Sequence, residues 1–186
     1  MMSKADVIRK TLAGQRVLDI GGCGYGQGNP YERELAAAWH LARSRARVDL
    51  SAAADVHVDL NARPLPEVDF SQWDITTAFD VLEHLDSPLD VLQWVGTTRL
   101  LVSVPNVLSP VTRRMEQRQG EHLYNFTPFT ITMLLQRGGW QVGRWHYTMG
   151  KWSLPARVIN MMASFVAPFT ATGIMLYCQK TNKTCC

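Results

Sequence analysis

The stretch Val17–Gly28, VLDIGGCGYGQG, decides the fold of this 186-residue chain. It begins with apolar residues, as a parallel strand that is covered on both faces requires. An acid, Asp19, stands near the end of this strand, and the residues after it are dense in glycine: Gly21, Gly22, Gly24, Gly26 and Gly28. Glycine accepts positive φ angles and lets the backbone approach a ligand closely. Because ligands of open α/β sheets bind beyond the carboxyl ends of the strands, the stretch predicts a ligand-binding loop.

The composition indicates an ordinary globular protein. Hydrophobic residues make up 46% of the chain, charged residues 19%, and the net charge is +3. The length fits one domain, which we expect at 1–180, with a disordered tail at 181–186. The charge is too small, and the basic residues too scattered, to indicate a nucleic-acid partner. The four cysteines form no CxxC pair and no zinc spacing, and the N-terminus lacks the apolar core of a signal peptide, so we expect a cytoplasmic protein.

One segment near the C-terminus raises the question of membrane contact. Val158–Gln179 contains no charged residue and is long enough to span a bilayer. Polar residues, Pro168 and Gly173 interrupt it, which favours a short helix followed by a strand. Membrane-surface contact through this C-terminal region stays open as an alternative.

Strands alternate with helices along the chain. We expect strands at Arg16–Ile20, Ala46–Leu50, Val56–Leu60, Trp73–Ala78, Arg99–Val104, Trp140–Tyr147 and Ile174–Cys178, and helices after Ser3 and at Tyr31–Arg43, Pro88–Val95, Pro128–Arg137 and Ala156–Ala167. Leu108–Glu121 reads as a polar, basic connection. The alternation predicts an α/β fold of the Rossmann-like, doubly wound kind, with a mostly parallel sheet covered on both faces. The gap between the second and third strands is too short for a crossover helix, so either that helix is missing or one strand is misplaced.

The glycine loop matches neither the G-x-G-x-x-G pattern of nicotinamide-binding domains nor the phosphate loop of nucleotide hydrolases. The pattern suits a ligand whose amino group meets Asp19 and whose carboxylate meets loop amides. Asp49 lies 23 residues after Gly26, near the spacing at which an acid accepts ribose hydroxyls. Asp59 and Leu60 end the next strand, where a carboxylate can accept an adenine amino group beside an apolar contact.

These motifs together resemble a known family. The chain looks like a small class I S-adenosylmethionine-dependent methyltransferase, and its block order is also similar to the methyltransferase-like protein of methionine biosynthesis. The matching blocks are VLDIGGCGYG from Val17, VDL at Val48–Leu50, VDLN at Val58–Asn61, WDITTAFDVLEHLDSPLDVL at Trp73–Leu92, LLVSVPN at Leu100–Asn106 and EHLYNFTPFTITMLLQRGGWQV at Glu121–Val142. The block from Trp73 is the most specific of them. The chain departs from the family pattern in one inserted residue, Gly22 or Cys23, and in the missing helix.

The resemblance implies a seven-stranded sheet whose last strand is antiparallel, with S-adenosylmethionine as cofactor and S-adenosylhomocysteine as product. It places the cofactor as follows: the methionine moiety at Asp19, Gly21, Gly22 and Gly24, the ribose at Asp49 and Leu50, the adenine at Asp59 and Leu60, and the sulfonium near Ala78 and Phe79. The missing helix makes Asp59 the least certain of these residues.

Two histidines are candidates for catalysis, because a hydroxyl acceptor needs a base. His84 follows the fourth strand, and His122 follows the connection after the fifth; either can instead be structural. Asp80, Glu83 and His84 are similar to a run that holds a divalent cation in ubiquinone-type O-methyltransferases, but we assign no metal. The arginines of the basic connection, Arg113, Arg114 and Arg118, either receive an anionic acceptor or lie in solvent.

Three hypotheses for the function follow. The first is a methyltransferase that modifies oxygen or nitrogen of a small molecule, with an acceptor pocket that is open or completed by a homodimer or a partner protein. The second is a non-catalytic partner protein that keeps the fold and the cofactor. The third is a lipid- or quinone-directed O-methyltransferase at the membrane surface. The lack of an Asn/Asp-Pro-Pro-aromatic motif and of a basic groove disfavours a nucleic-acid methyltransferase.

Overall fold

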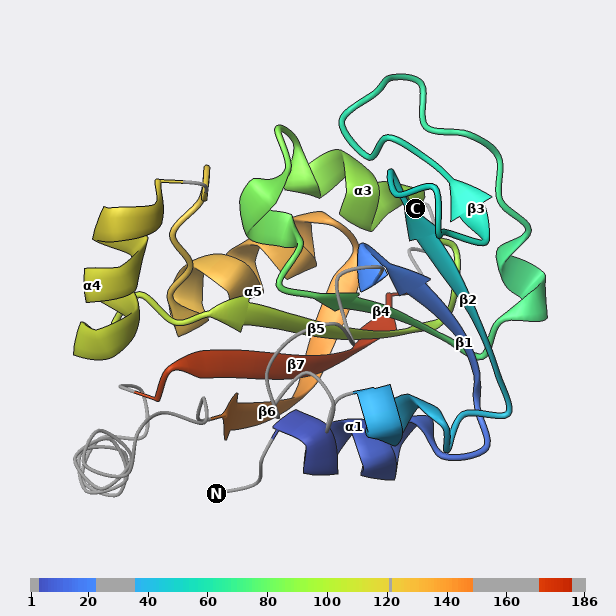
Figure 1. Ribbon diagram of the computed structural model, residues 1–186, viewed down its shortest axis with the longest axis horizontal. Helices are drawn as coiled ribbons and strands as arrows, with labels where there is room; N and C mark the ends of the chain where they lie inside the picture. The colour runs from blue at the N-terminus through green and yellow to red at the C-terminus, as the bar shows by residue number, and fades with distance from the viewer. Residues whose placement is uncertain (1–3, 23–35, 121, 149–170, 182–186) are drawn as a thin grey trace.

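The first half of the glycine-rich stretch lies at the centre of a seven-stranded sheet. A computed structural model of the chain describes residues 4–22, 36–120, 122–148 and 171–181 (Figure 1). The strands are β1 Arg16–Ile20, β2 Ser44–Asp49, β3 Val56–His57, β4 Ile75–Phe79, β5 Arg99–Pro105, β6 Trp140–Thr148 and β7 Gly173–Lys180, in the order β3-β2-β1-β4-β5-β7-β6. The first five strands are parallel, and β7 is antiparallel to both β5 and β6. The predicted mostly parallel sheet with an antiparallel last strand is confirmed.

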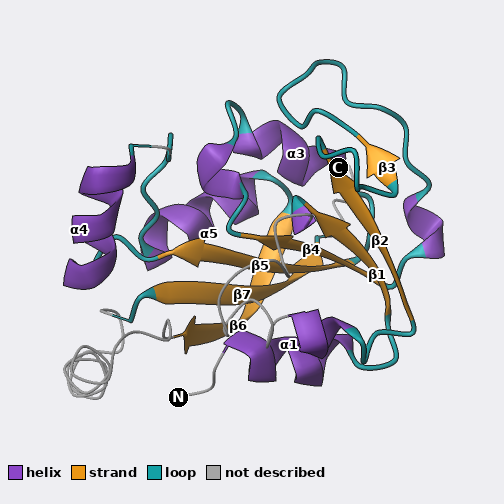
Figure 2. Ribbon diagram, in the orientation of Figure 1, coloured by secondary structure: helices purple, strands orange, loops and turns teal. Residues whose placement is uncertain are grey.

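Helices cover both faces of the sheet (Figure 2). They are α1 Lys4–Leu12, α3 Pro88–Trp94, α4 Pro110–Gln119, α5 Pro128–Arg137 and the short 3₁₀ helices η2 Phe70–Gln72 and η3 Leu82–His84. Two separate clusters of buried side chains lie on the two faces, one under α1 and the other under α3 and α5. Successive residues of β1 alternate between them, since Val17 packs with α1 while Leu18 packs with α3 and α5.

Helix α5 begins and ends where the sequence predicts. The side chain of Thr127 accepts a hydrogen bond from the backbone N–H of Thr130, and the side chain of Thr130 accepts one from the backbone N–H of Thr127. The two bonds form a capping box. Pro128 occupies the first helical turn, where its missing N–H costs nothing. Beyond the helix, Gly139 has φ +86°, a value that favours glycine.

The third strand is shorter than predicted. It ends at His57 and not at Leu60, so Asp59 lies in the loop after it. Only two residue pairs join β3 to β2, namely Val48 with Val56 and Asp49 with His57. Along the strand direction the chain therefore returns by only about 3 Å, one residue, between β2 and β3, and a short loop suffices where a helix is usual. Both strands exist, and the helix between them is the element that is missing.

Two other elements differ from the prediction. Part of the basic connection at 108–121 is the helix α4. The helix expected at Tyr31–Arg43 ends at residue 39. Its last predicted residues instead lead into β2, because the carbonyl of Leu41 accepts a hydrogen bond from Gly14 and the N–H of Arg43 donates one to Gln15. Ser3, the helix expected at 156–167 and the tail at 182–186 lie outside the described residues.

The uncharged segment at 158–179 can be followed only from residue 171. Its final part is β7, a buried strand between β5 and β6. Among the residues that the structure describes, no helix is long and apolar enough to cross a membrane.

An ion pair joins the starts of three central strands. The carboxylate of Asp74 accepts hydrogen bonds from the backbone N–H of Arg16 (2.8 Å) and from its guanidinium (2.7 Å). Arg99 donates to the carbonyl of Asp74 at 2.9 Å. The hydrogen bonds from Arg16 lower the pKa of Asp74 to about 2.

This low pKa gives a test of stability against pH. A carboxyl whose pKa is lower in the folded than in the unfolded chain stabilises the fold above its ordinary pKa and loses that effect as the pH falls through the folded value. We expect Asp74→Asn to unfold at lower urea concentration than the wild type at pH 7, with the difference closing as the pH falls from about 4 towards 2. A difference between the two urea midpoints that does not change with pH would contradict the ion pair.

Candidate active site

The four parallel strands β1, β2, β4 and β5 all end at one edge of the sheet (Figure 1). The glycine turn follows β1 at this edge, Asp49 closes β2, and Asp80 follows β4. This carboxyl edge is where open α/β sheets bind their ligands. The glycine turn, Asp49 and Asp80 therefore share this edge.

The first two glycines of the loop have no room for a side chain. Gly21 has φ +72°, and a Cβ there would lie 2.3 Å from a methyl carbon of Val81. A Cβ on Gly22 would lie 1.7 Å from a carboxylate oxygen of Asp19. Both positions thus require glycine, and the bare backbone of the turn lies directly over the end of β1. Gly24 lies outside the described residues.

Asp19 lies inside the protein and not on its surface. Its side chain is fully buried; Oδ1 accepts a hydrogen bond from the Thr77 hydroxyl at 2.6 Å, and Oδ2 is ion-paired with Arg45. Arg45 also donates to the carbonyl of Gly22 at 3.2 Å, and its guanidinium carbon lies 4.0 Å from the ring centre of Trp39. Asp19 and Arg45 therefore join β1, β2 and the glycine turn.

Burial shifts the pKa of this acid upwards. It raises the pKa of Asp19, and the positive charge of Arg45 and the hydrogen bond from Thr77 only partly offset that effect. Both oxygens of Asp19 accept hydrogen bonds from the protein, so Asp19 shapes the turn over which the methionine moiety is predicted to lie. A direct contact between Asp19 and the cofactor's amino group stays a prediction.

The residues predicted for the ribose and the adenine occupy two loops. The carboxylate of Asp49, at the end of β2, is half-buried and accepts a hydrogen bond from the N–H of Ser51 at 2.9 Å, while Leu50 is exposed. Asp59 is exposed and accepts from the N–H of Asn61 at 2.9 Å, while Leu60 is buried. The contacts of these residues with the ribose and the adenine stay a prediction.

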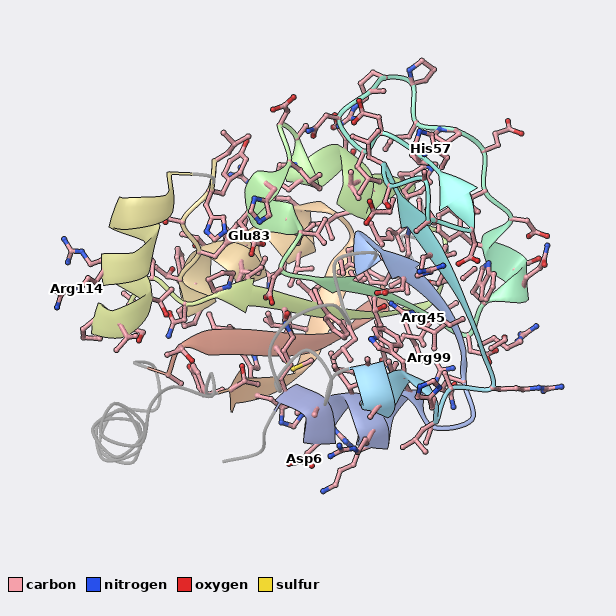
Figure 3. All side chains as sticks on the ribbon, in the orientation of Figure 1. Asp6, Arg45, His57, Glu83, Arg99 and Arg114 are labelled. Carbon is pink, nitrogen blue, oxygen red and sulfur yellow. The ribbon has the colours of Figure 1, made fainter. Side chains whose placement is uncertain are left out.

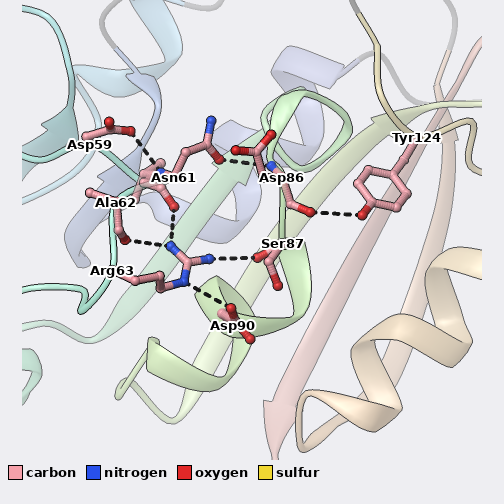
Figure 4. A network of polar contacts seen from close by, with 9 residues as sticks. Asp59, Asn61, Ala62, Arg63, Asp86, Ser87, Asp90 and Tyr124 are labelled. Carbon is pink, nitrogen blue, oxygen red and sulfur yellow. Dashed lines mark hydrogen bonds and ion pairs between the residues drawn. The ribbon is translucent and has the colours of Figure 1, made fainter.

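A network of polar contacts fixes the loop that carries Asp59 (Figure 4). Arg63 donates to the carbonyls of Leu60 (2.9 Å), Ala62 (2.7 Å) and Ser87 (3.4 Å) and to the carboxylate of Asp90 (2.9 Å). The N–H of Asp86 donates to the side chain of Asn61 at 2.9 Å, and the hydroxyl of Tyr124 donates to the carbonyl of Asp86 at 3.0 Å. The predicted adenine side is thereby joined to the segment that follows β4.

The turn after β4 has an unusual backbone. Asp80 has φ +53°, a left-handed conformation that is uncommon for a residue with a side chain. Its carboxylate is ion-paired with Lys4 of α1 and accepts a hydrogen bond from Ser103 of β5 at 2.8 Å. Burial alone would raise the pKa of Asp80, but Lys4 and Ser103 outweigh it and hold the pKa below its ordinary value. Ala78 and Phe79, just before this turn, are buried in the two faces of the sheet.

The two candidate histidines meet after this turn. The rings of His84 and His122 lie edge to face, with centres 4.4 Å apart. Glu83, between His84 and the buried Leu82, is 1% exposed. The N–H groups of Leu123 and Tyr124 both donate to the carbonyl of Glu83, at 2.8 and 3.2 Å, and so hold the two segments together. The structure therefore brings the sequence-predicted pair to one place.

Two arginines and two hollows remain to be placed. Arg113 and Arg114 are exposed on α4, and Arg114 points away from the sheet (Figure 3). A cavity of about 620 Å³ is lined by Val7, Arg99, Arg144 and Tyr177, near the start of β5, on the opposite side from the carboxyl edge. A second, apolar hollow of about 390 Å³ lies between Pro88, Tyr124, Phe126, Phe129 and Met133, within two residues of His122 along the chain.

The sequence did not indicate two residues of the site, Arg45 and Lys4. Arg45 lies within an alternating strand, and only the pairing of β2 with β1 brings its side chain to Asp19. Lys4 lies in a helix that reads as a surface helix, yet it is 3% exposed. Both are cations opposite acids that are distant in sequence, so no local pattern identifies them.

Comparison with known proteins gives one family. A family model described as "Methyltransferase domain" matches residues 4–143. No curated protein matches the chain at significant similarity.

Several solved structures share the fold at low sequence identity. The chain is similar to a Haloferax volcanii methyltransferase in complex with the Trm112 methyltransferase activator, at 11% identity and TM-score 0.64, over 96% of this chain and 89% of that one. S-adenosylmethionine-dependent methyltransferases from Mesorhizobium loti (14% identity, TM-score 0.58) and Archaeoglobus fulgidus (15%, 0.56) are also similar, each over 95% of both chains.

Proposed function

The chain belongs to the methyltransferase domain family, and we propose that this S-adenosylmethionine-dependent enzyme transfers a methyl group to oxygen or nitrogen of a small-molecule acceptor. The observation that carries the acceptor side of the proposal is the contact of His84 with His122 at the edge where the glycine turn and Asp49 also lie. We further propose that the protein acts in the cytoplasm.

The cofactor supplies an electrophilic methyl group on a positively charged sulfur, which leaves as the neutral thioether of S-adenosylhomocysteine. The chain's part is to hold the two reactants in line, and positioning alone can account for several kcal/mol of the barrier, roughly 7–11 in favourable cases. In this proposal the glycine turn, which is held by Asp19 and Arg45, orients the cofactor together with Asp49. In this proposal Ala78 and Phe79, which are buried at the end of β4, pack beneath the reacting centre.

An acceptor hydroxyl loses its proton as the methyl group is transferred, whereas an acceptor ammonium must lose a proton before its nitrogen can attack. His84 is exposed and His122 is half-buried, so an imidazole of this pair is accessible to an acceptor. The apolar hollow beside Tyr124 and Phe129 has a volume typical of small-molecule sites, roughly 300–1,000 Å³. It supports an acceptor with an apolar body and one nucleophilic group.

Binding of S-adenosylhomocysteine tests the cofactor half of this proposal. We expect isothermal titration calorimetry to give one site per chain. Absence of heat at high micromolar ligand would overturn the proposed function, because the product of the reaction must bind the same site.

The histidine pair gives the test of catalysis. We expect His122→Ala to lower kcat by about 10²–10⁴-fold, the usual contribution of a general base, while the Kd for S-adenosylhomocysteine stays unchanged. His40→Ala is the matched control, because His40 is an exposed histidine in the turn before β2. A His122→Ala enzyme with unchanged kcat on its acceptor would assign this histidine a structural role.

A protein partner is a second candidate for completing the site. The large exposed side chains Tyr124, Phe129 and Met133 line the apolar hollow, and the Haloferax volcanii neighbour was solved with an activator protein. A non-catalytic methyltransferase-like partner would bind S-adenosylmethionine without turnover and remain in a stable complex on pull-down. A lipid- or quinone-directed enzyme would instead float with liposomes, and recovery wholly in the soluble fraction would count against it.

A further inference from the structure

We propose that Glu83, His84 and His122 bind one divalent transition-metal ion, with Zn²⁺ as the ion used to test it. Each residue offers one ligand atom, and these atoms all lie within 4.8 Å of one another. Two imidazoles and a carboxylate form a donor set that suits zinc, iron or manganese and not magnesium, which prefers oxygen ligands. This site deepens the proposed function, because the same two imidazoles then act through an ion instead of taking the proton directly.

The geometry requires only small movements. Ligand atoms around a tetrahedral zinc ion, with bonds of about 2.0–2.1 Å, are separated by about 3.3 Å. The three atoms must therefore approach one another by about 1.5 Å at most. His84 is exposed and can turn at low cost, whereas Glu83 is buried and fixed. Glu83 would thus form the inner side of the site and His84 its outer side.

The backbone already holds the two ligand segments together. The N–H groups of Leu123 and Tyr124 donate to the carbonyl of Glu83, so the segment with His122 cannot separate from the segment with Glu83. The hydroxyl of Tyr124 adds a third contact, to the carbonyl of Asp86. These backbone contacts keep the ligand-bearing segments close together before an ion binds.

The ligand set differs from the acid-Glu-His run in the sequence. Asp80, the acid of that run, is ion-paired with Lys4 and hydrogen-bonded by Ser103, so it already has other partners. The structure brings in His122 from a distant segment in its place. Because His84 lies at the surface, the outer side of the ion remains open to water or to an oxygen of the acceptor, whose pKa the ion would lower.

Zinc calorimetry on the full chain tests the site. Cys185 and Cys186 end the chain and thiolates also bind zinc, so all proteins carry Cys185→Ser and Cys186→Ser. After treatment with EDTA, we expect one zinc ion per chain. His122→Ala, His84→Ala and Glu83→Gln should each weaken its Kd by more than about 100-fold, beyond the effect of losing an outer contact. His40→Ala should bind as the parent does.

The results distinguish a failure of the metal site from a failure of the proposed methyltransferase function. Failure of the parent protein to bind zinc, or an unchanged Kd in both His122→Ala and His84→Ala, would overturn the metal site. S-adenosylhomocysteine titrated into the same samples reports the fold and the cofactor site independently. Zinc binding without S-adenosylhomocysteine binding would overturn the proposed function and leave the metal site standing.

Discussion

Asp19→Asn is expected to lower the free energy of unfolding by about 3 kcal/mol, since it removes one partner of a buried ion pair. The asparagine has nearly the same shape, so the loss reports charge and hydrogen bonding and not packing. Arg45 is left over Trp39 without its carboxylate, and the hydroxyl of Thr77 loses a charged acceptor. The glycine turn loses the charged acceptor that holds Arg45 beneath it, and a hydrogen bond to a charged group contributes about 1.5–3 kcal/mol. The Kd for S-adenosylhomocysteine should therefore rise by more than about tenfold.

A second substitution separates the structural part from the binding part. Replacing both members of a buried ion pair by residues of similar volume is often nearly neutral, whereas removing one member is not. We expect Asp19→Asn with Arg45→Met to recover at least half of the lost stability in urea denaturation. Cofactor binding should not recover, because the glycine turn loses the donor to the carbonyl of Gly22. A single Asp19→Asn variant with an unchanged Kd would contradict the role of this acid.

Gly22→Ala is expected to weaken cofactor binding strongly, although it adds only one methyl group. The new Cβ would lie 1.7 Å from the Asp19 carboxylate, so either the turn or the acid must move. Overpacking of this kind costs about 1–3 kcal/mol, and here the strain falls on the turn itself. We expect the Kd for S-adenosylhomocysteine to rise by more than about tenfold, in line with that energy.

Gly143→Ala is the matched control for this variant. A Cβ at Gly143 meets its nearest atom, the carbonyl oxygen of Tyr177, at 3.6 Å, an ordinary contact. The control should bind S-adenosylhomocysteine as the wild type does, and its urea midpoint should move little. Equal affinities of the Gly22→Ala and Gly143→Ala proteins would remove the glycine turn from the cofactor site.

The sequence predicts the sheet well because local patterns determine it. β1 and α5 carry apolar residues of the right period between clear end signals, and both have the predicted bounds. The shortened β3 was not predictable in the same way, because Val58–Leu60 continue the apolar pattern after the ladder with β2 has ended. The segment of α4 resembles a connection in the sequence, because its polar residues give little apolar pattern.

For the same reason, the sequence predicts some residues of the site and misses others. Acids and glycines at strand ends are visible in the sequence, since the strand positions determine which edge they share. The partners of those acids are not visible: Arg45 and Lys4 reach Asp19 and Asp80 from other elements. The contact of His84 with His122 likewise depends on the backbone bonds at Glu83, which no local pattern encodes.

The stacking of Arg45 on Trp39 gives the protein an optical reporter of its own site. Trp39 is 5% exposed, and the guanidinium above it also holds the acid beneath the glycine turn. The emission of this indole depends on the charge above its ring, so any event that moves Arg45 changes the fluorescence. A Trp39→Phe protein shows the emission of the other tryptophans alone, so the signal of Trp39 is obtained by difference. Stopped-flow fluorescence can therefore follow, without a label, any step of cofactor binding that moves Arg45.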